Sequence, residues 1–162
     1  MIVAATGHRP DKIGGYEWEA PQRVWVRQQI KSSLLELRPT RCISGMALGV
    51  DQDFAWLCTE LSIPFTAALP FVGQEDNWPK HSQDWYEWLL IRADDVVVVS
   101  PGGYSAAKMQ VRNEWMVDNC DTLLAVWDGT EGGTRNCVNY AYYSYGPSFI
   151  KRINPNDFRN AA

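Results

Sequence analysis

The chain has 162 residues, 46% of them hydrophobic and 21% charged, a balance typical of one globular domain and not of a disordered chain. The net charge of −4, without a cluster of lysines and arginines, argues against a nucleic-acid partner. No apolar stretch approaches the roughly 20 residues of a membrane helix, and the N-terminus has no secretion signal, so we expect a cytoplasmic protein without a membrane partner.

Metal ligands in the usual patterns are also missing. The chain has two histidines and four cysteines, and the cysteines form no CxxC pair. We therefore expect reduced structural thiols and no metal site.

The first half of the chain alternates strand and helix signals. Apolar runs predict strands at 1–5, 40–44 and 64–69. Pro21 suits the first turn of a helix that extends to residue 38, and a second helix has apolar residues at i, i+3, i+4 and i+7 from Phe54. A long polar and aromatic loop, 70–79, follows the third strand.

The second half continues the alternation. Strands are predicted at 94–100, 122–127 and 148–153, and helices at 82–92, 105–119 and around 138–145. The run at 94–100 is apolar without alternation, as expected of a strand buried on both faces.

Short connections between alternating strands and helices imply a mainly parallel sheet with helices on both faces. The predicted fold class is therefore α/β. We expect a single Rossmann-like domain over residues 1–153, followed by a C-terminal tail over 154–162.

Three of the predicted strands end in glycine-containing turns, at 6–10, 44–49 and 128–134. The carboxyl ends of parallel strands meet at one edge of a sheet, where free backbone N–H groups and helix N-termini attract phosphate. This pattern favours a nucleotide-type ligand.

The last turn has the features of an anion cradle. Gly132 and Gly133 allow close approach of a ligand, and Thr134 can cap the helix while offering a hydroxyl. Asp128 and Glu131 could bind ribose hydroxyls. An ordinary strand–helix turn with solvated acidic residues would use the same residue types.

Arg112 is the main candidate for a charged contact to the ligand. It shares a helix face with Met109, and a cation on a partly apolar face calls for a counter-anion such as phosphate. The alternative is an arginine whose head reaches solvent, or one paired with Glu114 or Asp118.

Three further residues lie near the first two turns. His8 and Arg9 follow the first strand and could bind an anion, although His8 could instead hydrogen-bond within its turn. Asp51 could bind the ligand or cap the second helix.

The chain is rich in tryptophan, and four aromatic residues are of interest. Trp78 and Tyr104 are possible stacking partners for a base. Trp85 and Trp88, at helical spacing, favour a subunit interface.

Three motifs in order resemble the SLOG superfamily, which unites the DprA/Smf proteins with the Lonely Guy phosphoribohydrolases. They are the stretch at 109–116, the strand at 121–126 and the turn at 132–134. The early motifs at 6–10 and 44–51, and the segment at 70–78, are similar to its YpsA-like branch.

The resemblance implies a Rossmann-like nucleotide-binding fold that assembles as a homodimer or larger homo-oligomer. It places the ligand contacts at Gly7, His8, Arg9, Ser44, Gly45, Met46, Gly49, Asp51, Gln74, Trp78, Arg112, Asn113, Asp128, Gly132, Gly133 and Thr134. It implies no cofactor other than the nucleotide-type ligand itself.

Lonely Guy enzymes cleave an N-glycosidic bond with an arginine and with the glutamate of a PGGxGTxxE motif. Arg112 matches the arginine, but Cys137 stands where the glutamate is expected. A carboxylate stabilises the oxocarbenium character of such a cleavage. Only Asp128 or Glu131 could replace it, so the catalytic candidates are Arg112, Asp128 and Glu131.

The resemblance therefore favours a protein that binds a nucleotide or a nucleotide-derived signal, as a sensor or a sequestering protein, including in the conflict between bacteria and phages. The alternative is an N-glycosidase acting on a nucleoside monophosphate. A DNA-associated module of the DprA kind is the third hypothesis, and the acidic composition argues against it.

Overall fold

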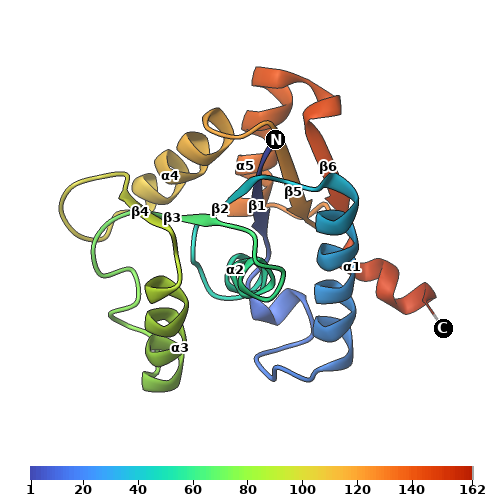
Figure 1. The fold of residues 1–162 in the computed structure, drawn as a ribbon, viewed down its shortest axis with the longest axis horizontal. Helices are drawn as coiled ribbons and strands as arrows, with labels where there is room; N and C mark the ends of the chain where they lie inside the picture. Colours follow the sequence, from blue (N-terminus) through green and yellow to red (C-terminus); the bar gives the residue numbers. More distant parts are fainter. Residues whose placement is uncertain (162) are drawn as a thin grey trace.

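The computed structural model of the chain describes residues 1–161 and contains one six-stranded parallel sheet with helices on both faces (Figure 1). The strands lie in the order β4-β3-β2-β1-β5-β6. Their bounds are Ile2–Gly7 for β1, Arg41–Ser44 for β2, Phe65–Leu69 for β3, Asp95–Val98 for β4, Thr122–Val126 for β5 and Ile150–Ile153 for β6. The predicted α/β fold class is confirmed.

The α-helices cross from strand to strand, and short 3-10 helices lie in the connections. The α-helices are α1 (Pro21–Leu37), α2 (Val50–Glu60), α3 (Lys80–Ile91), α4 (Ala106–Asp118) and α5 (Gly133–Tyr145). The 3-10 helices are η1 (Pro10–Lys12), η2 (Pro147–Phe149) and η3 (Pro155–Asn160). Among residues 1–161, no helix is both long enough and apolar enough to cross a bilayer.

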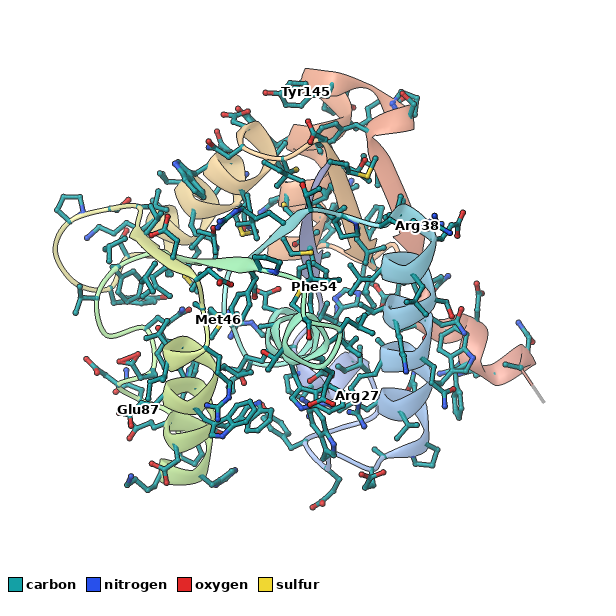
Figure 2. All side chains as sticks on the ribbon, viewed as in Figure 1. Arg27, Arg38, Met46, Phe54, Glu87 and Tyr145 are labelled. Atoms are coloured by element: carbon teal, nitrogen blue, oxygen red, sulfur yellow. The ribbon has the colours of Figure 1, made fainter. Side chains whose placement is uncertain are left out.

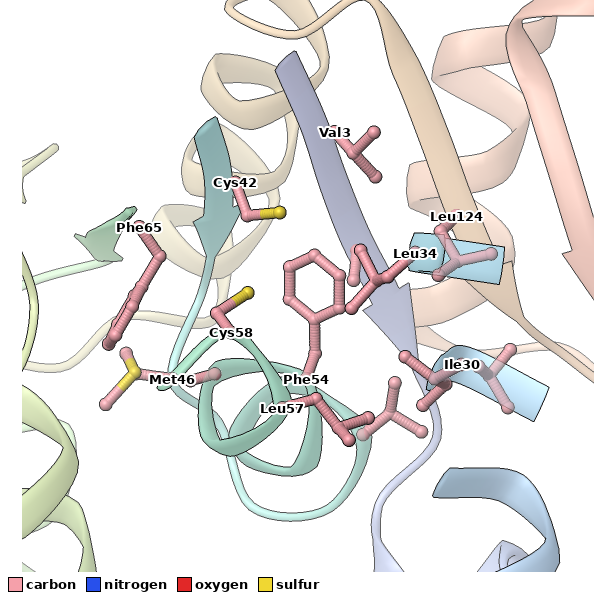
Figure 3. Close-up of a cluster of buried hydrophobic side chains, with 14 of the residues drawn as sticks. Val3, Ile30, Leu34, Cys42, Met46, Phe54, Leu57, Cys58, Phe65 and Leu124 are labelled. Carbon is pink, nitrogen blue, oxygen red and sulfur yellow. The ribbon is translucent and has the colours of Figure 1, made fainter. Parts of the chain in front are cut away.

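One face of the sheet is covered by α1, α2 and α3. Phe54 of α2 is fully buried there, in one cluster with Val3 of β1 and Leu34 of α1 (Figure 3). Figure 2 likewise shows Phe54 in the middle of the molecule, with Glu87 and Tyr145 toward the surface. Burial of one side chain of this size stabilises the fold by about 1.5–3 kcal/mol.

The opposite face is covered by α4 and α5. Met116 of α4 and Ala141 of α5 pack with Leu123 of β5 in a second, smaller cluster of buried side chains. The sheet is therefore the middle layer of three, as a parallel sheet requires.

The strand at the β4 end of the sheet departs from the sequence prediction. The run at 94–100 is not buried on both faces, because β4 is the edge strand and pairs with β3 alone. Val96 is 43% exposed and Val98 is 45% exposed. A continuous valine run reflects strand propensity as well as burial, so it does not distinguish an edge strand from a central one.

The segment predicted as a C-terminal tail contains η3, which packs on α1. The ring of Phe158 lies 6.1 Å from that of Trp25, and Pro155 is buried. Residue 162 lies outside the described part of the chain.

Candidate functional site

A cavity of about 300 Å³ opens where the strand order reverses, at the carboxyl ends of β1 and β5. From β1 the chain proceeds through β2, β3 and β4 on one side, and it then returns to place β5 on the other side. Open α/β sheets bind ligands at such a switch point. We call this space the switch-point cavity.

Most of the residues predicted from the three turns line this cavity. The predicted residues that line it are Gly7, His8, Arg9, Asp51, Arg112, Asn113, Glu131, Gly132, Gly133 and Thr134. The sequence reasoning missed Thr6, Asp11, Lys12, Ala47, Met109 and Thr130, which complete the lining. Thr6, Ala47 and Thr130 lie within the predicted turns, and Asp11 and Lys12 directly follow the first of them, so extending that turn by two residues would have found these two.

The N-terminus of α5 is open to the cavity. Gly132 is the N-cap residue, with φ 143° and no side-chain cap, and a Cβ added to Gly132 or Gly133 would meet no atom within 4 Å. Thr134 lies inside the helix and does not cap it, contrary to one sequence expectation. The first backbone N–H groups of α5 are thus free for an anion.

Arg112 is buried, and its head reaches neither solvent nor the acidic residues of its own helix. Its Nη1 donates to the carbonyl oxygens of Gly45 and Ala68, and its Nε donates to Oδ1 of Asn113 at 3.2 Å. Burial lowers the pKa of Arg112, and nearby Asp51 opposes that shift. The guanidinium therefore joins the ends of β2 and β3 while lining the cavity.

Asp51 lies beside this guanidinium and does not cap α2, whose N-cap is Gly49. Its Oδ2 accepts a hydrogen bond from the Ala47 amide at 3.3 Å. Burial raises the pKa of Asp51, and the charge of Arg112 counteracts the shift. A Cβ on Gly45 would lie 2.6 Å from Nη1 of Arg112 and 2.9 Å from Oδ2 of Asp51, so only glycine admits both.

Two more glycines let the first turn pack on the start of α2. A Cβ on Gly7 would lie 2.5 Å from Cγ1 of Val50. Gly49 has φ 95°, and its Cβ would lie 2.5 Å from the carbonyl oxygen of His8. These contacts fix the wall of the cavity between β1 and α2.

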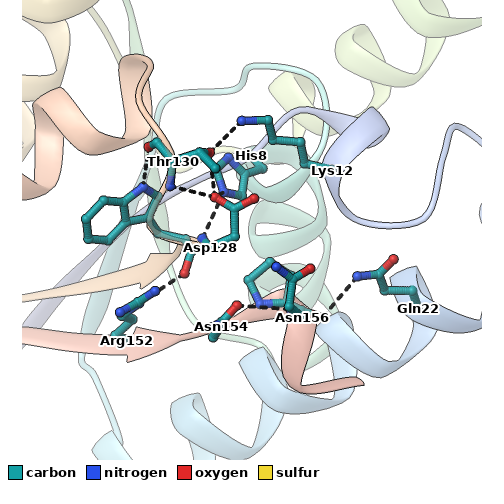
Figure 4. A network of polar contacts seen from close by, with 10 residues as sticks. His8, Lys12, Gln22, Asp128, Thr130, Arg152, Asn154 and Asn156 are labelled. Carbon is teal, nitrogen blue, oxygen red and sulfur yellow. Dashed lines mark hydrogen bonds and ion pairs between the residues drawn. The ribbon is translucent and has the colours of Figure 1, made fainter. Parts of the chain in front are cut away.

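His8 belongs to a polar network with the β5–α5 turn (Figure 4). Its Nε2 accepts a hydrogen bond from the Asp128 amide at 3.0 Å, and it also lies 2.9 Å from Oδ1 of Asp128. Thr130 donates its amide to the same Oδ1 at 2.9 Å, and Lys12 donates to the Thr130 hydroxyl at 2.6 Å. The network ties the first and last turns together.

The two titratable groups of this network shift in the same direction. Burial lowers the pKa of His8, and the charge of Asp128 opposes that shift. Partial burial would raise the pKa of Asp128, but the Thr130 donors, His8 and Lys12 outweigh it and bring the pKa to about 2.

Several predicted ligand contacts do not line the cavity but support it. Ser44 donates to the Asp51 carbonyl at 2.7 Å, and Gln74 donates to the Gly45 carbonyl at 3.2 Å. Trp78 packs edge-on against Tyr86, with ring centroids 5.4 Å apart. The residues outside the lining are Ser44, Gly45, Met46, Gly49, Gln74, Trp78 and Asp128.

The charges around the cavity are mixed. Arg9, Lys12 and Arg112 are cationic, whereas Asp11, Asp51 and Glu131 are carboxylates. Such a lining can hold an anion at α5 and accept hydrogen bonds from hydroxyl groups elsewhere. Within residues 1–161, His, Cys, Asp and Glu form no cluster of three suited to a metal ion.

Trp85 and Trp88, predicted at a subunit interface, pack within the chain. Their rings stack with centroids 5.0 Å apart. Trp85 also packs in T-shaped geometry against Trp18, with ring centroids 5.6 Å apart. Tyr104, a predicted stacking residue, is 77% exposed and does not line the switch-point cavity.

A parallel sheet with glycine turns at its switch point defines a Rossmann-like α/β protein. The chain belongs to the YspA SLOG family, which matches residues 3–155. This match confirms the resemblance drawn from the motifs.

Relatives from two bacilli extend this assignment. The chain is 37% identical over 131 residues to the SPbeta prophage-derived protein YoqJ of Bacillus subtilis strain 168, a match that covers 71% of this chain and 77% of that protein. It is 27% identical over 143 residues to a UPF0398 protein of Bacillus cereus strain B4264, covering 82% of this chain and 77% of the relative.

Solved structures with the same fold include two DNA processing proteins A. The protein from Streptococcus pneumoniae superposes with a TM-score of 0.68 at 17% identity, over 94% of this chain and 50% of that one. The protein from Helicobacter pylori is described for its single-stranded DNA binding mode. It superposes with a TM-score of 0.61 at 15% identity, over 99% of this chain and 79% of that one. The chain thus spans half the length of the first of these proteins.

Proposed function

We propose that the chain binds a nucleotide or a nucleotide-derived small molecule in the switch-point cavity. The observation that carries the proposal is the N-terminus of α5, where Gly132 and Gly133 leave the first amides uncapped and open. A phosphate placed there would meet backbone donors and the positive end of the helix.

The surrounding side chains suit the rest of such a ligand. Within residues 1–161, Nη2 of Arg112 donates no hydrogen bond, which leaves it free for a ligand oxygen. Asp11 and Asp51 line the same cavity and can accept hydrogen bonds from sugar hydroxyls. No cofactor beyond the ligand is needed for this role.

The residues at the catalytic positions favour holding the ligand over cleaving it. Cys137, which replaces the family glutamate, is fully buried, and burial raises the pKa of its thiol to about 12. Glu131 is exposed and pairs with Arg135 at 2.8 Å. Asp128 accepts hydrogen bonds from Thr130 instead of facing the cavity.

A binding protein without its own chemistry is a sensor or a sequestering protein. The relative from the SPbeta prophage supports a role in the conflict between bacteria and phages, because its name places that relative in a phage genome.

The test is a titration calorimetry screen of the whole chain with AMP, ATP, ADP-ribose and cyclic dinucleotides. Gly133→Asp places a carboxylate at the start of α5 in space that is empty, and Gly133→Asn is its uncharged match. We expect Gly133→Asp to weaken binding at least about tenfold relative to Gly133→Asn, since it repels phosphate. Equal affinities of the two variants, or no binding of any probe, would contradict the proposal.

The alternative function is an N-glycosidase acting on a nucleoside monophosphate, with Arg112 at the phosphate and Asp128 or Glu131 as the carboxylate. Chromatography of incubated AMP, GMP, CMP and UMP detects free base. Base release that Glu131→Gln or Asp128→Asn abolishes would replace the binding proposal with this one.

Single-stranded DNA is a further alternative, because one neighbour of the same fold is described as binding it. The lining of the cavity carries as many carboxylates as cations, which favours a small ligand over a polyanion. Fluorescence anisotropy with a labelled oligo(dT) at moderate salt decides between them, and micromolar binding would favour DNA.

We also propose a homodimer formed through the free edge of β4. Its outer backbone groups are unpaired in the sheet, and Val96 and Val98 are exposed beside them. Two such edges related by a two-fold axis can pair antiparallel. Light scattering of Val98→Lys should then give a lower mass than the parent protein, and an unchanged mass would exclude this edge.

A further inference from the structure

A second cavity, of about 350 Å³, lies on the other side of the turn that precedes α2. It shares no lining residue with the switch-point cavity. Pro10 and Gly49 line it, whereas their near neighbours Arg9 and Ala47 line the other space. We call it the tryptophan cavity.

Its walls are three tryptophans from three separate segments. Trp18 precedes α1, Trp56 lies on α2 and Trp85 lies on α3. The Trp18 ring packs in T-shaped geometry against Trp56 and Trp85, with ring centroids 5.1 Å and 5.6 Å apart. Arg27 lies over the Trp18 ring, 3.8 Å from its centroid. The aromatic walls are therefore held in place before any ligand arrives.

A buried ion pair fixes the segment that carries Trp18. Arg23 donates twice to Asp53, from Nε at 3.0 Å and from Nη2 at 2.9 Å. The same guanidinium donates to the Tyr16 carbonyl at 3.2 Å, and Arg27 donates to the Trp18 carbonyl at 2.7 Å. Such a preorganised wall lowers the entropy lost on binding.

Polar groups with free capacity also line the tryptophan cavity. Gln52 is only 2% exposed and donates to the Met46 carbonyl at 3.2 Å, yet its amide oxygen accepts no hydrogen bond within residues 1–161. In the same described range, the Ser82 hydroxyl makes none either, although Ser82 is buried. Both groups can pair with the edge of a ligand.

The charges of the lining restrict the ligand further. No carboxylate is among the described residues that line the cavity, and the nearby Asp53 is already paired with Arg23. A cationic guest would meet like charge from Arg23. The volume falls in the range of about 300–1,000 Å³ that is common for small-molecule sites.

We propose that the tryptophan cavity binds an uncharged planar heteroaromatic molecule of nucleobase or nucleoside size. Its rings pack against the tryptophans, and its polar edge pairs with Gln52 and Ser82. Stacking on aromatic side chains tolerates any base, so the walls supply affinity and the two polar groups supply selectivity. The proposal stands without the function proposed for the switch-point cavity.

The test titrates the full chain with adenosine, guanosine, cytidine and uridine, which carry no phosphate. Trp56→Leu removes one wall, and Tyr16→Ala changes a lining residue that is 65% exposed and therefore leaves the core intact. We expect at least one nucleoside to bind, with an affinity that falls about fivefold or more in Trp56→Leu and less in Tyr16→Ala. Binding should also quench tryptophan fluorescence.

Two controls separate this site from the rest of the molecule. Trp25→Leu changes a tryptophan that packs on Phe158 and does not line the cavity, so it should leave nucleoside affinity unchanged. Gly133→Asp should likewise have no effect, because it alters only the switch-point cavity.

Three results would overturn the proposal. The first is no binding of any nucleoside at millimolar concentration. The second is a nucleoside affinity that neither Trp56→Leu nor Tyr16→Ala lowers. The third is an affinity that falls in Gly133→Asp, which would assign the nucleosides to the switch-point cavity. The first two results leave the phosphate-bearing probes of that cavity untouched.

Discussion

The two cavities lie on either side of one turn and are built by different means. The switch-point cavity combines charged side chains with glycine-containing turns at strand ends, and glycines set its shape. The tryptophan cavity consists of large rings on helices and loops, and a buried ion pair holds one wall. The first depends on close approach of backbone, whereas the second depends on paired charges.

This difference predicts which substitutions each region tolerates. Each region contains one buried carboxylate. Asp53, beside the tryptophan cavity, accepts two hydrogen bonds from Arg23, whereas Asp51, in the switch-point cavity, accepts one hydrogen bond from a backbone amide at 3.3 Å. Asp53→Ala, Gly7→Ala, acid titration of Asp128 and Gly133→Asp test this difference, in order of decreasing predicted effect on stability.

The largest effect is expected for Asp53→Ala, which leaves Arg23 buried without its partner. Removing one member of a buried ion pair lowers the free energy of unfolding by about 3–5 kcal/mol. Asp51→Ala is the matched change on the other side of the turn, with an expected loss of about 1–3 kcal/mol. Urea denaturation measures both, and equal losses would remove the proposed distinction.

The next effect is expected for Gly7→Ala, whose new methyl group would collide with Val50. Overpacking of this kind lowers the free energy of unfolding by about 1–3 kcal/mol. Gly103→Ala is the control, because a Cβ there meets nothing within 4 Å, and it should change stability by less than about 0.5 kcal/mol. A tolerated Gly7→Ala would show that the turn can move away from α2.

A smaller effect concerns pH and Asp128, whose pKa falls from 3.8 to about 2 on folding. Because the folded pKa is depressed, the ionised group stabilises the protein above pH 3.8, and this contribution disappears as the pH falls through about 2. We expect a loss of about 1 kcal/mol across that window, after allowance for solvent screening.

Denaturation curves over the same pH range provide the check. Asp128→Asn should abolish this part of the pH dependence, and Thr130→Val should reduce it, because Thr130 donates to the carboxylate. An identical pH dependence in the parent and in Asp128→Asn would exclude the network as its source.

The smallest effect is expected at the start of α5. Gly133→Asp should be more stable than Gly133→Asn by about 0.3–1 kcal/mol at low salt, because a carboxylate interacts favourably with the positive end of a helix. Thermal unfolding at two salt concentrations measures the difference, which should shrink as salt is added. No difference at low salt would show that the α5 amides are already satisfied.

The fold and the switch-point cavity were largely predictable because their signals are local in the chain. The alternation of strands and helices placed six strands near their observed positions. The glycine turns after β1 and β5 contributed Gly7 and Gly133 to the lining as expected. The burial of 94–100 was predicted wrongly, since strand order decides burial and short-range patterns do not reveal it.

The remaining features depend on contacts between distant segments. The ring centroids of Trp18 and Trp85 lie 5.6 Å apart, although α1, β2, α2 and β3 separate the two residues in the chain. The head of Arg112 lies at the ends of β2 and β3, a place that helix periodicity alone does not specify. Such positions follow only from the packed structure.

The central pairing of the sheet has a consequence for synthesis. β1 pairs with β2 on one side and with β5 on the other. During synthesis, Val3 of β1 therefore cannot pair with Thr122 of β5 until β5 has left the ribosome. Long-range parallel pairing slows folding, and an incomplete sheet exposes apolar surface in the meantime. The switch-point cavity therefore cannot form until the chain has been synthesised as far as Thr134, and a chain truncated before β5 would lack it altogether.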